Sequence, residues 1–200
     1  SIIHRGPDAK GSYIDSDIAL GFRRLSIIDI EGGNQPMFNE DNSLVLVFNG
    51  EIYNFKQLRE ELQLKGHVFG SNADSEVVLH GFEEWKGDVV NHLRGMFAFV
   101  IFDKVSKELF GARDMFGIKP FYYTITENSF VFGSEIKALL HHPEFNKQLN
   151  EQALAHYLSF QYSPTEETFF KNVYKLPPAH SFTFKDGKLS KQRYFLPNFN

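Results

Sequence analysis

The 200-residue sequence contains no cysteine, so it can form neither a disulfide framework nor a thiolate metal site. It has no Asn-x-Ser/Thr sequon, nothing resembling a signal peptide, and no apolar run near the roughly 20 residues that a membrane span requires. Basic residues are not in excess: 21 lysines and arginines against 25 aspartates and glutamates leave a net charge of −4. These absences predict a soluble, cytoplasmic domain with neither nucleic-acid nor membrane partners.

Several common site patterns are missing as well. Neither G-x-x-x-x-G-K-[ST] nor G-x-G-x-x-G occurs, so no glycine-rich loop is available to cradle a nucleotide phosphate. The eight histidines include no His-Glu-x-x-His pair, and the adjacent His141 and His142 would diverge on a helix. No Ser-His-Asp arrangement can be singled out. We therefore expect no metal and no cofactor in this chain.

What the sequence does contain is a large aromatic core. Hydrophobic residues make up 42% of the chain, and the 22 phenylalanines favour a core between broad apolar faces over a thin helical bundle. A chain of this length buries about 70% of its unfolded surface as one domain.

Helices and strands are predicted in blocks. Apolar periodicity and capping residues predict strands over 17–22 and 43–48 and an antiparallel meander after 96, with a loop before 14. Helices are predicted over 51–65, 75–86, 88–95, 134–142 and 150–160. Asp186-Gly187 predicts a hairpin, and the proline pair at 177–178 is the one candidate junction. This order favours an α+β fold with antiparallel sheets.

The stretch VFNGEIYN (47–54) joins the predicted strand at 43–48 to the predicted helix at 51–65. Asn49 and Gly50 both tolerate positive φ, so one interpretation is a simple turn. The other is a pair of adjacent donors, the Asn49 side-chain amide and the Gly50 backbone N–H, which can hold an oxyanion. The dipeptide alone favours the turn.

Three charged residues complete a possible binding site. Arg24 is either a surface charge on an edge strand or a bidentate clamp for a carboxylate. Asp74 is either a helix cap or an anion that holds an ammonium group, and Glu51 opens a helix where an acid is favoured anyway. Together with Asn49 and Gly50, they would suit an α-amino acid that carries a side-chain amide.

Seven motifs then occur in a recognisable order: HRGPD (4–8), RRLSIID (23–29), FNGEIYN (48–54), GMFAFVIFD (95–103), ARDMFGIKPFYY (112–123), GSEIKAL (133–139) and LPPAH (176–180). Over essentially its whole length the chain resembles the glutaminase domain of the glutamine-hydrolysing asparagine synthetases, which are class II, N-terminal-nucleophile amidotransferases. The resemblance implies a four-layer αββα sandwich of two antiparallel sheets flanked by helices. It also implies an oxyanion hole at Asn49 and Gly50, and L-glutamine binding by Arg24, Leu25, Ser26, Ile27, Ile28, Asn49, Gly50, Glu51 and Asp74.

The sequence departs from this family at its nucleophile. Family members use an N-terminal cysteine a few dozen residues before HRGPD, whereas Ser1 stands three positions before His4. Ser1 has a hydroxyl and a free amine, but we expect instead that residues 1–200 are a single glutaminase domain without its N-terminal nucleophile segment. Residues 177–200 would lead towards the interdomain linker.

The resemblance also implies partners outside these 200 residues. A C-terminal synthetase domain in cis would carry ATP and Mg²⁺ and amidate aspartate, and a homodimer is a further expectation. Three alternatives stay open: a cysteine-free module that binds glutamine and regulates a partner, an amidotransferase domain serving another acceptor, and a plain interaction domain.

Overall fold

A computed structural model of the chain describes residues 1–25 and 33–198. Its strands are β1 (Ala9–Ile14), β2 (Ala19–Arg24), β3 (Met37–Phe38), β4 (Leu44–Ile52), β5 (Gly95–Asp103), β6 (Glu108–Arg113), β7 (Tyr122–Ile125), β8 (Phe130–Gly133), β9 (Tyr174–Lys175), β10 (His180–Lys185) and β11 (Lys188–Arg193). Its helical segments are η1 (Ile3–Arg5), α1 (Phe55–Leu64), α2 (Glu76–Trp85), η2 (Lys86–Asp88), α3 (Val89–His92), α4 (Ile136–Leu139) and α5 (Glu151–Phe160).

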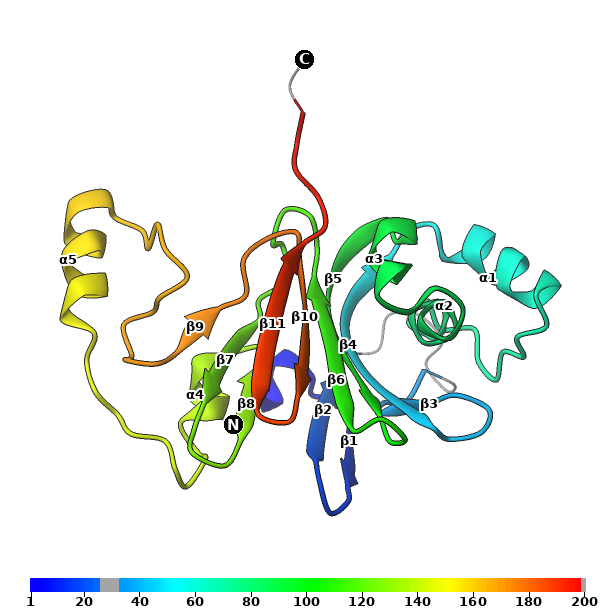
Figure 1. Ribbon diagram of the computed structural model, residues 1–200, viewed down its shortest axis with the longest axis horizontal. Helices are drawn as coiled ribbons and strands as arrows, with labels where there is room; N and C mark the ends of the chain where they lie inside the picture. Colours follow the sequence, from blue (N-terminus) through cyan, green and yellow to red (C-terminus); the bar gives the residue numbers. More distant parts are fainter. Residues whose placement is uncertain (26–32, 199–200) are drawn as a thin grey trace.

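One large antiparallel sheet forms the centre of the molecule, with strand order β11-β10-β6-β5-β4-β3. Figure 1 shows α1, α2 and α3 together beside β4 and β5. Two smaller sheets, β1-β2 and β8-β7-β9, lie against the other face, and α4 packs on β7 and β8. The chain therefore has the α+β sandwich of antiparallel sheets and flanking helices that we expected.

Two apolar cores follow from the alternation of side chains along β4 and β5. The first lies between the large sheet and helices α1–α3 and includes Leu46, Phe48, Leu62, Val78 and Phe99. The second lies between the large sheet and the small sheets. It is rich in aromatic rings and includes Val45, Val100, Phe121, Tyr123 and Phe182. The aromatic residues thus fill broad faces on both sides of one sheet, as the composition predicted.

The predicted turn at Asn49-Gly50 is wrong. Strand β4 continues through both residues to Ile52, and Gly50 pairs with Phe97 of β5. The φ of Gly50 lies outside the left-handed region, so turn geometry is not its purpose. A Cβ at Gly50 would instead lie 2.2 Å from the Met96 carbonyl oxygen. Glycine is therefore needed here because β5 approaches closely.

Other element predictions need smaller corrections. The expected loop before residue 14 contains β1, whose side chains only alternate between partial burial and exposure, so its hydrophobic signal is weak. The third helix is short, and Gly95 begins β5 instead of ending a helix. Helices at 75–86 and 150–160 are confirmed, and the Asn150 side chain caps α5 by accepting a hydrogen bond from the Ala153 N–H at 3.2 Å.

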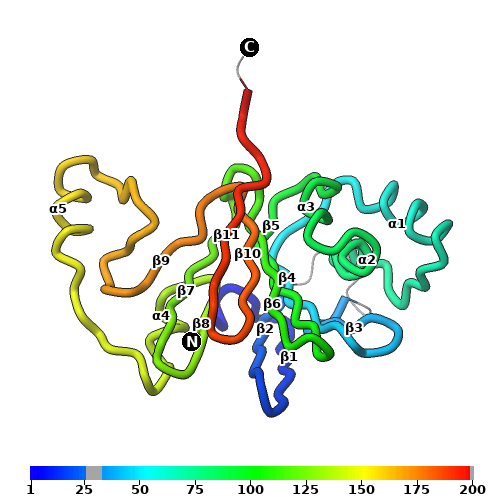
Figure 2. The backbone as a smooth tube through the Cα atoms, viewed as in Figure 1, coloured from blue at the N-terminus to red at the C-terminus, as the bar shows by residue number. Residues whose placement is uncertain are grey.

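The proline pair at 177–178 is not a domain junction. Strands β10 and β11 follow it and extend the large sheet beyond β6, with the hairpin turn at Asp186-Gly187 as predicted. Figure 2 shows the chain leaving the body of the domain only after β11. The domain therefore includes the residues that were expected to lead into a linker, up to Arg193.

Packing between strands predicts that replacing two glycines by alanine will change the free energy of unfolding by different amounts. A Cβ at Gly111 of β6 would lie 2.4 Å from the Phe182 ring, whereas a Cβ at Gly21 of β2 would meet nothing within 4 Å. Overpacking of this kind costs about 1–3 kcal/mol, so Gly111→Ala should lower the free energy of unfolding by that amount. Gly21→Ala should change it by no more than about 0.5 kcal/mol. Urea denaturation measures both, and equal effects would contradict the assigned packing.

Candidate functional site

A cavity of about 230 Å³ opens at the edge of β4 where β3 has ended. Pockets for drug-sized ligands measure about 300–1,000 Å³, so this smaller cavity suits a small metabolite. Segments distant in the sequence line it: Arg5, Phe22, Arg23, Arg24, Leu25, Gly33, Gln35, Phe48, Asn49, Gly50, Glu51, Ala73, Asp74, Ser75 and Lys119. All six of the predicted binding residues that the structure describes are in this set. The remaining three, Ser26, Ile27 and Ile28, lie outside the described residues.

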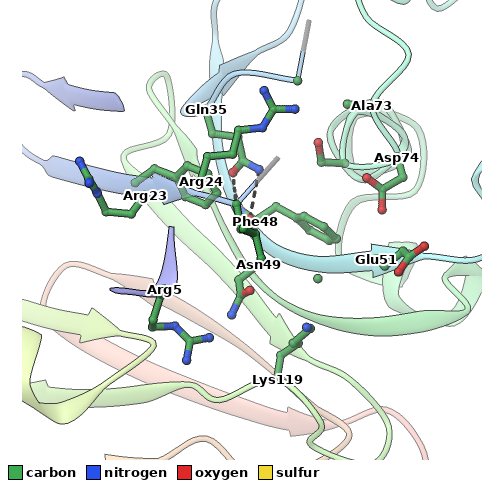
Figure 3. A pocket seen from close by; sticks show the side chains of 15 residues that line it. Arg5, Arg23, Arg24, Gln35, Phe48, Asn49, Glu51, Ala73, Asp74 and Lys119 are labelled. Carbon is green, nitrogen blue, oxygen red and sulfur yellow. Dashed lines mark hydrogen bonds between the residues drawn. The ribbon is translucent and has the colours of Figure 1, made fainter. Parts of the chain in front are cut away.

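The edge of β4 presents alternate backbone groups to this cavity. Phe48 donates its N–H to Gln35 Oε1 at 2.6 Å and accepts from Gln35 Nε2 at 3.1 Å, as Figure 3 shows. Ile52 donates its N–H to Asp74 Oδ2 at 2.7 Å. In an antiparallel ladder, alternate residues point their N–H groups to the same side. The N–H of Gly50, halfway between these two, therefore faces the cavity edge.

A second donor lies beside it. The side-chain nitrogen of Asn49 is buried and has no hydrogen-bond partner in the described part of the chain. A buried amide N–H₂ left without an acceptor costs about 1–3 kcal/mol, so native proteins rarely keep one without a use. The arrangement is therefore suited to a ligand oxygen that accepts from Asn49 Nδ2 and Gly50 N–H together.

Asp74 provides a negative charge at the cavity. It lies just before α2, yet its side chain does not cap this helix and instead accepts from Ile52 across the site. Only 8% of the residue is exposed, and burial raises the pKa of its carboxyl, an effect that the nearby charge of Glu51 increases. A carboxylate disfavoured in this way gains from a bound cation, because the cation offsets the missing solvation.

Arg24 lies at the end of β2 and is buried, with 7% of its surface exposed. In Figure 3 Arg24 lies to the left of Asp74 and Glu51, and Asn49 lies below Phe48. Because Arg24 is buried, an edge-strand surface charge is the wrong interpretation for it. The cavity lining combines this guanidinium with two carboxylates and the donors of Asn49 and Gly50.

Nine of the lining residues were not predicted as site residues, among them Arg5, Gln35 and Lys119. Arg5 and Lys119 lie within HRGPD and ARDMFGIKPFYY, and this motif membership was the signal that could have identified them. Gln35 gave no such signal. Its side-chain amide makes the two hydrogen bonds to the Phe48 backbone that a neighbouring strand would otherwise make, and this depends on the tertiary structure. Ser1, considered above for its hydroxyl and free amine, is exposed and does not line this cavity.

Two of the seven sequence motifs, HRGPD and GSEIKAL, contact each other in space. His4 and Arg5 of HRGPD contact Glu135 Oε1 of GSEIKAL at 2.8 Å and 3.3 Å. Together with Lys137, they lower the pKa of the Glu135 carboxyl to about 2, although partial burial opposes the shift. This contact holds Arg5 near the cavity.

Arg113 and Asp114 hold the backbone of the loop that carries Lys119. Arg113 donates to the carbonyls of Gly117, Lys119 and Leu176 at 2.6–2.7 Å. The buried Asp114 carboxylate accepts from the N–H groups of the same turn, including that of Lys119 at 3.0 Å. A charge-assisted network of this kind fixes a loop without secondary structure.

Comparison with known proteins agrees with this geometry. A family model described as a glutamine amidotransferase domain matches residues 1–195. The chain belongs to the glutamine amidotransferase domain family. No helix in its described residues is both long and apolar enough to cross a membrane.

Several curated relatives align with nearly the whole amidotransferase domain. This chain is 45% identical to "Asparagine synthetase [glutamine-hydrolyzing] 1" of Bacillus subtilis, over 99% of its own length and 31% of the relative. It is 35% identical to "Putative asparagine synthetase [glutamine-hydrolyzing] 2" of Methanocaldococcus jannaschii, over 100% of this chain and 43% of that protein. "Amidase chry2" of Gibberella zeae is 36% identical over 96% of this chain and 28% of its own length. The chain thus spans about a third of these relatives.

Solved structures support the same fold. A B. subtilis glutamine phosphoribosylpyrophosphate amidotransferase superposes with a TM-score of 0.60 at 20% identity, over 90% of this chain and 35% of that one. An allosteric regulatory enzyme of purine biosynthesis gives a TM-score of 0.62 at 21% identity, with the same coverage.

The environment of Asp74 predicts that its negative charge, which suits ligand binding, lowers the free energy of unfolding of the ligand-free domain. Because its folded-state pKa is raised, the ionised carboxylate opposes folding at neutral pH, and this opposition disappears as the pH falls through the folded-state pKa. Asp74→Asn keeps an oxygen for the Ile52 N–H but removes the charge. It should raise the free energy of unfolding of the ligand-free domain at pH 7, by an amount that shrinks on acidification.

Denaturant unfolding at pH 7 and at progressively lower pH measures this effect. Glu60→Gln, at an exposed position of α1, is the control and should stay within about 0.5 kcal/mol of the unchanged protein. A clear loss of stability in Asp74→Asn at pH 7 would show that the carboxylate is not a strained, site-directed group.

Proposed function

We propose that this domain binds L-glutamine and releases its side-chain nitrogen as ammonia, as the glutaminase part of an asparagine synthetase. The observation that carries this proposal is the buried Asn49 amide without a partner, next to the Gly50 N–H at the cavity edge. Two donors at one point are what a tetrahedral oxyanion requires.

The charges on both sides match the rest of the substrate. The planar fork of Arg24 suits the α-carboxylate, and Asp74 with Glu51 suits the α-ammonium. A glutamine held at both groups extends its side-chain amide towards Asn49 and Gly50. Leu25 contributes an apolar wall, and Ser26, Ile27 and Ile28 are proposed to continue the same binding segment.

In the reaction, a thiolate attacks the amide carbon and the carbonyl oxygen becomes an oxyanion held by Asn49 and Gly50. The oxyanion then re-forms the carbonyl as the C–N bond breaks, and the nitrogen leaves as ammonia with the proton that the thiol had given to the nucleophile's own amine. Water hydrolyses the resulting thioester to glutamate. The family nucleophile is a cysteine, and the 200 residues contain none. The groups in this chain therefore supply substrate binding and transition-state stabilisation, and the nucleophile is provided by residues outside it.

Asparagine synthesis is the proposed use of the ammonia, because the relatives similar to this chain include several named for that activity. The synthetase domain in cis, its ATP and Mg²⁺, and a homodimer are parts of the same proposal. A different acceptor is the second candidate, since a relative named as an amidase is also 36% identical to this chain.

Glutamine should stabilise the chain if the cavity is its site. A ligand that binds only the folded state adds about 2.7 kcal/mol at 100 times its dissociation constant. L-Glutamine should therefore raise the melting temperature, and D-glutamine, whose α-substituents are exchanged, should not. Arg24→Lys keeps the charge but loses the fork, so it should weaken binding about 10- to 100-fold, as expected for lost hydrogen bonds to a charged group.

Arg193→Lys, the same change on the exposed strand β11, is the control for Arg24→Lys and should bind glutamine as tightly as the unchanged chain. No stabilisation by L-glutamine at any concentration would contradict the binding site itself, in which case a plain interaction domain becomes the better description.

The oxyanion role has its own test in the enzyme that carries the nucleophile. Asn49→Ala should lower the kcat of glutamine hydrolysis by about 10²–10³ and leave KM little changed, because the lost interaction forms mainly in the transition state. Asn91→Ala, an exposed asparagine near the end of α3, should have normal kinetics. Unchanged turnover in Asn49→Ala would refute the oxyanion assignment even if glutamine binds.

A further inference from the structure

A group of two histidines and two glutamates comes together beside α2, and none of them lines the cavity. One ligand atom from each side chain lies within 4.8 Å of all the others: Glu40, His67, His80 and Glu83. His80 Nδ1 is 2.8 Å from Glu83 Oε2 and 3.6 Å from Glu40 Oε2. His67 Nδ1 is 3.5 Å from Glu83 Oε2. Four ligands at 2.0–2.1 Å around a tetrahedral metal are separated by about 3.3 Å, so little movement is needed.

Both glutamates have one oxygen fixed by the protein and the other turned into the cluster. Glu83 Oε1 accepts from Asn39 Nδ2 at 2.8 Å, which leaves Oε2 facing both histidines. Glu40 Oε1 accepts from the Val68 N–H at 2.9 Å, which leaves Oε2 facing His80. The inward oxygens are thus oriented as ligands by hydrogen bonds to their partners.

Both histidines repeat this arrangement. The nitrogen of each ring that points away from the cluster faces a carboxylate: His80 Nε2 lies 3.5 Å from Glu76 Oε1, and His67 Nε2 lies 3.6 Å from Glu84 Oε2. Histidine ligands of metals characteristically donate their other N–H to a carboxylate, which fixes the ring and makes the ligating nitrogen more basic. The His80 ring is almost fully buried, and its Nε2 makes no hydrogen bond in the described part of the chain.

We propose that this chain binds one Zn²⁺ ion through four side chains: Glu40, His67, His80 and Glu83. Two imidazole nitrogens and two carboxylate oxygens form a mixed donor set that suits zinc, whereas Mg²⁺ and Ca²⁺ prefer oxygen ligands only. The two carboxylates balance the charge of the ion. Glu40 is 41% exposed and gives the ion an entry path from solvent.

The ion would join three segments that are separate in the sequence. Glu40 belongs to the β3–β4 turn, His67 to the loop between α1 and α2, and the other two ligands to α2. These parts lie together at the right-hand side of Figure 1. Because Glu76 also accepts from the N–H groups of Gly70 and Ser71 at 2.6 Å and 2.9 Å, the ion would stabilise the loop that leads to Asp74.

The competing occupant of the cluster is a proton. Burial disfavours the charged form of His80, but the neighbouring carboxylates of Glu76 and Glu83 outweigh it and raise its pKa to about 9. Without metal, a protonated His80 would satisfy the same carboxylates. Zinc must displace this proton, so a direct measurement of metal binding is needed to separate the two states.

The decisive experiment is zinc titration of the untagged, chelator-treated full chain at pH 7.5, by calorimetry and by metal analysis after gel filtration. We expect one Zn²⁺ per chain and a higher melting temperature with ZnCl₂ but not with MgCl₂. His67→Gln and Glu40→Gln remove ligands near the surface, where refolding is not at risk, and each should weaken zinc binding at least 10-fold. His141→Gln, an exposed histidine outside the cluster, is the matched control and should bind normally.

Failure to bind one zinc would overturn the proposal and leave the cluster as a protonated ion-pair network. Equal affinity in His67→Gln, Glu40→Gln and the unchanged chain would do the same, because the ion would then lie elsewhere. These outcomes do not depend on glutamine, so the zinc site and the proposed function can fail independently.

Discussion

The ladder between β4 and β5 is the constraint on which the rest of the structure depends. Nine residue pairs join Leu44–Ile52 to Gly95–Asp103, and both faces of these strands are covered. A strand buried on both faces cannot shift its register by one residue without exchanging its two apolar sets. The ladder therefore fixes which face of β4 meets the helices, and with it the position of Asn49 and Gly50.

The candidate site exists because the large sheet stops short at this strand. β3 pairs with only two residues of β4, so no strand of the described residues pairs with the edge from Phe48 to Ile52. Gln35 and Asp74 satisfy the N–H groups of Phe48 and Ile52, and Gly50 between them remains directed at the cavity. An interrupted edge is normally a liability in a sheet. Here side chains and a binding cavity cover it.

Buried charges occur at two places near α2, one just before its first turn and one along the helix. Before its first turn, Asp74 is buried at the cavity with a raised pKa, which favours a bound cation such as an ammonium. Along the helix, Glu76 and Glu83 surround His80 and favour either a proton or a metal ion. The same helix thus connects the cavity to the proposed zinc cluster through the loop at 66–75.

The amino-acid sequence alone determined the fold class, the helices at 75–86 and 150–160 and six of the residues that line the cavity, because periodicity, caps and motifs are local properties. It could not show that β4 runs through Asn49-Gly50, since the need for glycine comes from the close approach of Met96 on another strand. Nor could it find Gln35 or the cluster around His80, whose members are up to 43 residues apart in the chain (40 to 83). Only the tertiary structure decided these features, because they depend on which backbone edges remain unpaired and which side chains meet after distant segments pack together.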